Sequence, residues 1–138
     1  MALPFLCARH KQHVLCQPEQ AIIDIQNSQL TGEALFKRYQ FAQALPYLGT
    51  ALESISLLAQ MYKCVDKDQL IQITSLTECL YTTLHFLNEK SAAASALAHS
   101  IDLLYELFNE EQHGDLILTC ITQLKKLALQ PCAQLTEH

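Results

Sequence analysis

The segment from Gly32 to Leu52 reads GEALFKRYQFAQALPYLGTAL and decides the fold. Apolar residues recur on both sides of a short polar break at the three- and four-residue spacing of an amphipathic helix. A second segment, from Leu80 to Ile101, reads LYTTLHFLNEKSAAASALAHSI and repeats the order of helix, turn and small-residue helix. Such a repeat is typical of stacked helical hairpins. The two segments therefore predict an all-α scaffold that binds a partner, and neither carries a residue set that indicates a reaction.

The composition fits a single helical domain without a basic surface. The chain has 138 residues, half of them hydrophobic, which is enough to bury a core. Three glycines and four prolines favour helices over strands. Nine Lys and Arg against 14 Asp and Glu give a net charge of −5. Because nothing in this balance attracts phosphates, we expect no nucleic-acid or membrane partner.

The N-terminus and the cysteines indicate a cytoplasmic protein. Residues 1–8 are apolar, but they are too few to span a bilayer, and no basic residue precedes them. We therefore expect an unanchored, cytoplasmic chain. The six cysteines are interpreted as reduced thiols, because those within apolar helix patterns behave as small hydrophobes.

Start and stop signals predict five antiparallel helices. Pro18 and Glu19 suit a first helical turn, and an aspartate at 66–68 and Ser91 are candidate caps. The helices are expected at about 18–38, 41–62, 70–87, 91–108 and 116–127. The domain prediction is an irregular head at 1–16, a single helical domain at 17–130 and a loose tail at 131–138.

The first segment resembles the tetratricopeptide repeat. Gly32 matches the close-packing glycine of that repeat, and an aliphatic residue follows at Leu35. Small and large positions of the second helix are matched by Phe41, Ala44, Leu48 and Ala51. Small residues let the two helices of a hairpin approach closely, while larger ones fill the space beside them. The resemblance is good over residues 26–62.

The second segment is a weaker, longer relative of the first. Aligned positions over 73–108 are Leu80, Leu84, Ala93, Leu97 and Ser100, but Tyr81 stands in place of the glycine. Ala44 and its counterpart Ala93 are 49 residues apart, whereas the repeat has a period of about 34. The resemblance thus implies tetratricopeptide-like stacked hairpins, with helices elongated by about two turns each and a C-terminal capping helix.

The resemblance also implies a groove lined by the first helix of each hairpin. The residues carried onto it are Gln29, Glu33, Phe36 and Lys37 from the first hairpin and Glu78, Thr82, His85 and Phe86 from the second. Of the Lys, Arg and Asn set with which family members clamp a terminal carboxylate, only Lys37 is present. We therefore expect a mixed polar and aromatic groove for a protein or peptide partner. The alternative is that Phe36 and Phe86 belong to the core.

Two hairpins are fewer than the three or so that a stacked array needs to cover its ends. The fifth helix is expected to cap one end. The other end is covered either by the head segment or by a second copy of the chain, which would make a homodimer.

Two sets of residues were weighed for chemistry. Cys7, His10, His13 and Cys16 are zinc-ligand types spaced by three, but they are too even for the usual two pairs, so neither metal nor cofactor is expected. The Ala98-His99 phrase resembles the histidine phosphotransfer domain. That family follows its histidine with a lysine and a glycine, whereas Asp102 and Leu103 occupy those places here. A carboxylate one turn from His99 would repel a phosphoryl group.

These observations predict a non-enzymatic interaction module, such as an adaptor, chaperone or regulator, that binds a protein or peptide through a helical groove or end face. The alternative is a phosphotransfer or metal-binding regulator that uses His99 or the N-terminal Cys and His residues.

Overall fold

The computed structural model of this protein describes residues 4–63, 65–109 and 111–129. Over these ranges the chain forms six α-helices and no strand. The helices are α1 (Ala8–Cys16), α2 (Pro18–Lys37), α3 (Phe41–Tyr62), α4 (Lys67–Phe86), α5 (Lys90–Glu106) and α6 (Gly114–Leu129). The all-α prediction is confirmed. The expected tail at 131–138 lies outside the described residues.

The predicted count of five helices is wrong, because the head that we expected to be irregular contains α1. This helix has nine residues, too few to be stable alone. It packs on α2 and α3 and buries Val14 between them. Its stability therefore comes from tertiary contacts, which the local sequence pattern does not display.

Local signals set most of the other helix boundaries. Pro18 occupies the first turn of α2, as predicted. The aspartate cap of α4 is Asp66. Its side chain accepts a hydrogen bond from the backbone amide of Gln69 at 2.8 Å. In return, the backbone amide of Asp66 donates to Gln69 Oε1 at 3.0 Å. Ser91 does not cap α5, because that helix begins one residue earlier and Glu89 precedes it.

Each junction from α2 to α6 is turned by a residue in the left-handed backbone region. These residues are Tyr39 (φ 61°), Lys63 (φ 50°), Asn88 (φ 62°) and His113 (φ 57°). Left-handed residues commonly end helices, and glycine is the usual type. Here Tyr, Lys, Asn and His residues adopt the left-handed conformation instead of glycine. The low glycine content therefore does not prevent sharp junctions between antiparallel helices.

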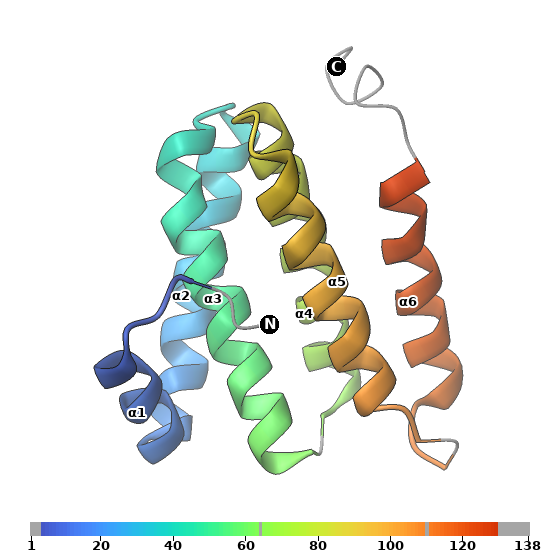
Figure 1. Ribbon diagram of the computed structural model, residues 1–138. Helices are drawn as coiled ribbons and strands as arrows, with labels where there is room; N and C mark the ends of the chain where they lie inside the picture. Colours follow the sequence, from blue (N-terminus) through green and yellow to red (C-terminus); the bar gives the residue numbers. More distant parts are fainter. Residues whose placement is uncertain (1–3, 64, 110, 130–138) are drawn as a thin grey trace.

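The helices run up and down beside one another and pack mainly in sequence order (Figure 1). In that view α3 and α5 form a front layer, with α2 and α4 behind them. α6 packs on both α4 and α5 at one end of the stack, while α1 packs on α2 and α3 at the other. The last helix therefore covers one end of the stack, and the head segment lies over α2 and α3 at the other.

The core runs through the middle of the stack and is rich in leucine. Its fully buried large apolar side chains are Leu48, Leu52, Leu70, Ile73, Leu76, Leu80, Leu103, Leu104, Ile117 and Leu124. They come from α3, α4, α5 and α6, so the two hairpins and α6 share one core. α2 contributes mainly small contact residues, among them Ala21 and Gly32.

The hairpin of α2 and α3 depends on close packing at Gly32. A Cβ atom at this position would lie 2.9 Å from the Leu48 side chain and 3.2 Å from its backbone nitrogen. Ala44 and Ala51, the other two small residues expected to allow a close approach, are also buried on α3. The small residues therefore do let the two helices approach closely.

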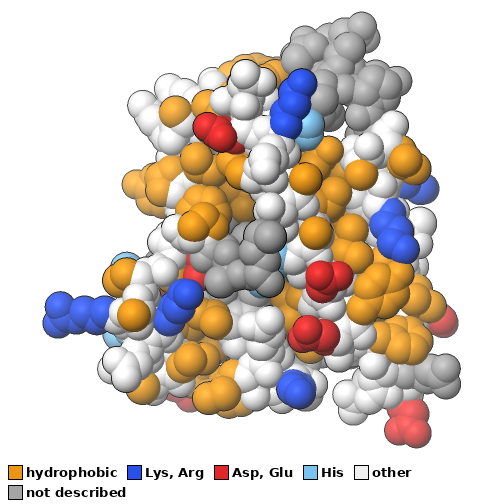
Figure 2. Space-filling model, viewed as in Figure 1, with side chains coloured by type: hydrophobic (Ala, Val, Ile, Leu, Met, Phe, Trp, Pro, Cys, Tyr) orange, Lys and Arg blue, Asp and Glu red, His pale blue; other side chains and the backbone are white. Residues whose placement is uncertain are grey.

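The surface mixes apolar and polar side chains. In the face shown in Figure 2, basic side chains are few and scattered, and hydrophobic ones lie between the polar ones over α3, α5 and α6. Among the described residues, no helix combines the length and the apolar character needed to cross a bilayer.

Two buried threonines on α4 differ in how their hydroxyls are satisfied. Thr77 Oγ1 donates to the Ile73 carbonyl and is hydrogen-bonded to Ser100 Oγ of α5, each at 2.7 Å. Thr83 is equally buried, yet its Oγ1 has no hydrogen-bond partner within the described part of the chain. A buried hydroxyl without a partner costs folding free energy.

Gly32→Ala is expected to lower the free energy of unfolding by about 1–3 kcal/mol, because the added methyl group overpacks the contact with Leu48. Urea denaturation followed by circular dichroism would measure the change. Thr31→Ala, an exposed neighbour on α2, is the matched control. Since alanine favours helices by about 1 kcal/mol over glycine, a stabilised Gly32→Ala protein would contradict the close packing.

Thr83→Val is expected to raise the free energy of unfolding by about 1 kcal/mol, because it replaces an unpaired hydroxyl with a methyl group of similar shape. Thr77→Val should instead lower it by about 1–2 kcal/mol, because it breaks two hydrogen bonds and leaves Ser100 with one partner fewer. Thermal or urea unfolding of the two variants side by side would test the contrast. Equal destabilisation of both proteins would contradict it.

Candidate functional site

Four of the predicted groove residues lie on one side of α2, facing α4. Gln29 and Glu33 are one turn apart, and the Gln29 amide donates to Glu33 Oε1 at 2.7 Å. The Gln72 amide of α4 donates to Gln29 Oε1, also at 2.7 Å. These bonds join the first helices of the two hairpins. Gln72 was not among the predicted residues, since only its place opposite Gln29 distinguishes it from other surface glutamines.

An aromatic cluster lies at the end of this face. Phe41, the first residue of α3, stacks on Phe86 with ring centroids 4.4 Å apart. The rings of Phe36 and Tyr39 pack edge-on against the Phe41 ring, with centroid distances of 5.6 and 5.9 Å. None of the four rings is fully buried, and Tyr39 is 64% exposed. Phe36 and Phe86 therefore belong neither to the deep core nor to an open groove wall. They form a packed aromatic patch at the surface.

The helical repeat separates the predicted residues of α4 into two stripes. Gln72, Cys79 and Phe86 are seven residues apart and share the stripe that faces α2. Glu78 and His85 each precede a member of this stripe by one residue, which turns them about 100° around the helix. His85 packs on Tyr81, with ring centroids 4.5 Å apart. Thr82 is half-buried. We use the name α2–α4 face for the following residues on the facing sides of the two helices: Gln29, Glu33, Phe36, Lys37, Gln72, Cys79 and Phe86.

The electrostatics of Cys79 show that charges from both helices converge on this face. Burial raises the pKa of the Cys79 thiol to about 11, and the negative charges of Glu33 and Glu78 add to this effect. Lys37 acts in the opposite direction. The thiol is therefore protonated at neutral pH and unsuited to act as a nucleophile. Burial also raises the pKa of the Glu78 carboxyl above that of an ordinary glutamate.

The four candidate zinc ligands lie along the N-terminal segment. Cys7 precedes α1, while His10, His13 and Cys16 lie within it, and all four side chains are exposed. In the described ranges no group of three or more His, Cys, Asp or Glu side chains is arranged to hold a metal ion. His10 and His13 instead line the rim of a pocket of about 350 Å³ between α1, α2 and α3.

His99 lies on α5 with its side chain partly buried. Its Nε2 atom is almost completely shielded from solvent. A phosphotransfer histidine must present a ring nitrogen to the aspartyl phosphate of its partner, so this geometry does not favour that role. Asp102, one turn away, is exposed.

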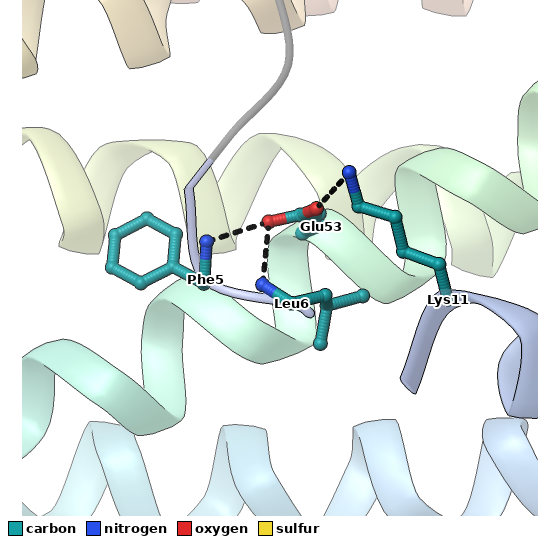
Figure 3. A network of polar contacts seen from close by, with 4 residues as sticks. All are labelled: Phe5, Leu6, Lys11 and Glu53. Atoms are coloured by element: carbon teal, nitrogen blue, oxygen red, sulfur yellow. Dashed lines mark hydrogen bonds and ion pairs between the residues drawn. The ribbon is translucent and has the colours of Figure 1, made fainter. Parts of the chain in front are cut away.

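A site that the sequence did not suggest lies on α3. Glu53 is 4% exposed and accepts hydrogen bonds from two consecutive backbone amides, Phe5 N at 2.8 Å and Leu6 N at 3.1 Å. Lys11 Nζ lies 3.6 Å from the second carboxylate oxygen of Glu53 (Figure 3). One turn away, a Cβ atom at Gly49 would overlap the Phe5 ring. We call Gly49 and Glu53 the Glu53 site; it holds the N-terminus against the bundle.

One sequence signal does single out Glu53. It is the only charged residue in the 22 residues of α3. A lone carboxylate in an otherwise uncharged helix is unlikely to be buried without donors, because an unpaired buried charge is costly. The signal does not say where the donors come from, and they lie 47 and 48 residues away.

No protein-family model, curated protein or solved structure matches the chain.

Glu78→Gln is expected to stabilise the protein at pH 7. A folded-state pKa above the unfolded one means that ionisation opposes folding, and this cost grows as the pH rises through the folded pKa. Below the pKa of an unfolded glutamate, about 4.3, the cost vanishes, so the stabilisation should disappear near pH 4. Urea unfolding from pH 4 to 8 would measure it, with Glu106→Gln as an exposed control. A gain independent of pH would contradict the assignment.

Proposed function

We propose that this chain is a non-enzymatic protein-interaction module that binds a protein or peptide partner on the α2–α4 face. The observation that carries the proposal is the aromatic cluster of Phe36, Tyr39, Phe41 and Phe86. Three of these rings pack on the fourth, Phe41, so the cluster gathers four of the ten Phe and Tyr residues of the chain at one place on the surface. Aromatic side chains of this kind anchor many protein interfaces, because they bury large areas at little entropic cost.

The polar part of the face supports the proposal by offering selectivity beside the anchor. Gln29 and Gln72 form a bridge whose remaining amide groups can bond to a partner's backbone. Glu33 and Lys37 place one charge of each sign within two turns of Phe36. Such a surface fits an amphipathic segment that has apolar side chains toward the rings and mixed charges along its edge. It offers no cluster of cations for a terminal carboxylate.

A tetratricopeptide-like architecture belongs to the same proposal. The contact of Gly32 with Leu48 is the kind of close helix packing on which that resemblance was based. The order in which α2, α3, α4 and α5 pack also suits two stacked hairpins. In such a stack the first helix of each hairpin, here α2 and α4, contacts the partner. The cytoplasmic location expected from the sequence remains a part of the proposal.

The proposal is tested by photo-crosslinking followed by affinity measurement. A photo-reactive amino acid at Thr82, beside the α2–α4 face, should give one predominant protein adduct in a lysate of the source cells. The same amino acid at Thr122, which is exposed on α6, should not give that adduct. Identical adducts from both positions, or none from Thr82, would contradict the proposal.

Tyr39→Ala is then expected to weaken binding of the identified partner by tenfold or more, since loss of an anchor typically costs about 2 kcal/mol. Isothermal titration calorimetry would measure the dissociation constant. Tyr62→Ala is the matched control, because Tyr62 is 53% exposed at the opposite end of α3. Equal affinities of the wild type and Tyr39→Ala would remove the aromatic cluster from the binding site.

A further inference from the structure

The N-terminal segment, residues 4–16, contacts the rest of the described chain through α2 and α3. Its firm attachment is the Glu53 site, where two backbone amides and Lys11 meet one buried carboxylate (Figure 3). The Phe5 ring covers the bare backbone of Gly49. Beyond these contacts, Leu6 and Val14 are the buried apolar side chains of the segment. The polar part of the attachment thus converges on one carboxylate.

The remaining packing of α1 is loose. A pocket of about 350 Å³ separates parts of α1 from α2 and α3, with Leu6, Val14 and Ile25 among its apolar lining residues. A space of this size deprives the surrounding side chains of contacts that a filled interface would make. A peripheral segment opens more readily than the elements that are enclosed by others. The N-terminal segment can therefore detach as a unit.

A single non-helical residue joins this segment to α2. Gln17 has φ −130° and ψ 68°, and Pro18 follows at the first position of α2. Because proline lacks an N–H, the hydrogen-bond ladder of α1 cannot continue into α2. Rotation about Gln17 can thus swing residues 4–16 away without disturbing either helix. This is the geometry of a hinge.

Exposed apolar side chains lie beside the hinge. Ile22 and Ile23, in the second turn of α2, are 42% and 51% exposed. Ile22 borders a pocket of about 130 Å³ with Ile55, Leu58 and Tyr62. When two identical chains exchange a terminal segment, their hinges pass each other close to the two-fold axis. Residues next to the hinge of one chain then face the same residues of the other chain. Apolar residues at these positions would stabilise the dimer, because their surface is removed from water.

We propose that two copies of this chain exchange residues 4–16 and form a closed two-fold dimer. The Phe5 ring and the Phe5 and Leu6 amides of one protomer would occupy Gly49 and Glu53 of its partner, and the reverse contact would close the pair. The exchanged contacts are those already present within one chain, because every copy carries both the segment and its site. The added contact is the burial of Ile22 and Ile23 of both protomers around the hinges. This dimer does not use the aromatic cluster, so it stands or falls independently of the proposed function.

Light scattering over a range of concentrations tests the association. The wild-type chain of 15.5 kDa is expected to shift toward twice that mass as its concentration rises. Ile22→Ser with Ile23→Ser should weaken dimerisation at least tenfold. Leu30→Ser is the matched control, because Leu30 is on the same helix and 69% exposed but lies three turns from the hinge. A wild type that remains monomeric at millimolar concentration would overturn the proposal.

A mixing experiment tests the exchange itself. Gly49→Val blocks the Glu53 site but leaves the segment intact, whereas Phe5→Ala removes the ring but leaves the site intact. Each variant alone loses the Phe5–Gly49 contact in its monomer and in its dimer alike, and circular dichroism would confirm that it is folded. In an equimolar mixture, the segment of the first can occupy the site of the second, so native mass spectrometry should detect the mixed dimer. A mixture that contains no more mixed dimer than random pairing of the two variants would overturn the exchange, because only the mixed dimer regains an intact Phe5–Gly49 contact.

Discussion

The enclosure of α3 is the constraint on which the rest of the structure depends. This helix packs against α1, α2 and α4 and also touches α5. From Leu48 to Ala59 nearly every residue is buried, so the usual division into a core face and a solvent face is lost. A helix in this position requires small residues wherever a neighbour approaches closely. Gly49 and Ala51 meet that requirement on α3 itself, and Gly32 meets it from α2.

Glu53 is the exception within this helix, and it links the chain terminus to the core. A carboxylate in such surroundings is tolerable only when donors replace the lost water. Within α3 the backbone amides are already committed to the helix, and no cation is available. The donors come from an irregular stretch whose amides also need acceptors. Two segments that would each be unsatisfied alone thus satisfy each other, and the position of α1 follows from this contact.

The sequence predicted the features that depend on local physics. The helices now labelled α2 and α3 were expected at nearly their observed bounds, because Pro18 and the break near Tyr39 act within a turn or two. The close packing at Gly32 was expected from the resemblance to the tetratricopeptide repeat, whose physical basis is the small size of the residue. What could not be predicted depends on distant partners: α1, which is stable only on α2 and α3, and Glu53, whose donors lie 47 and 48 residues away. The split of α4 into two stripes likewise depends on where α2 lies, and it places Glu78 and His85 on a different stripe from Cys79.

The long sequence separation within the Glu53 site has a consequence for synthesis of the chain. Residues 4–6 are made first, but the carboxylate that receives them follows 47 or 48 residues later. At the usual elongation rates this delay is about 2–10 s, far longer than the microseconds in which helices form. During that interval the growing N-terminus has no acceptor in its own chain. Neighbouring ribosomes on one messenger carry chains at later stages, whose α3 helices have already emerged, so newly made Phe5 and Leu6 can meet the Glu53 of an older copy before their own is complete.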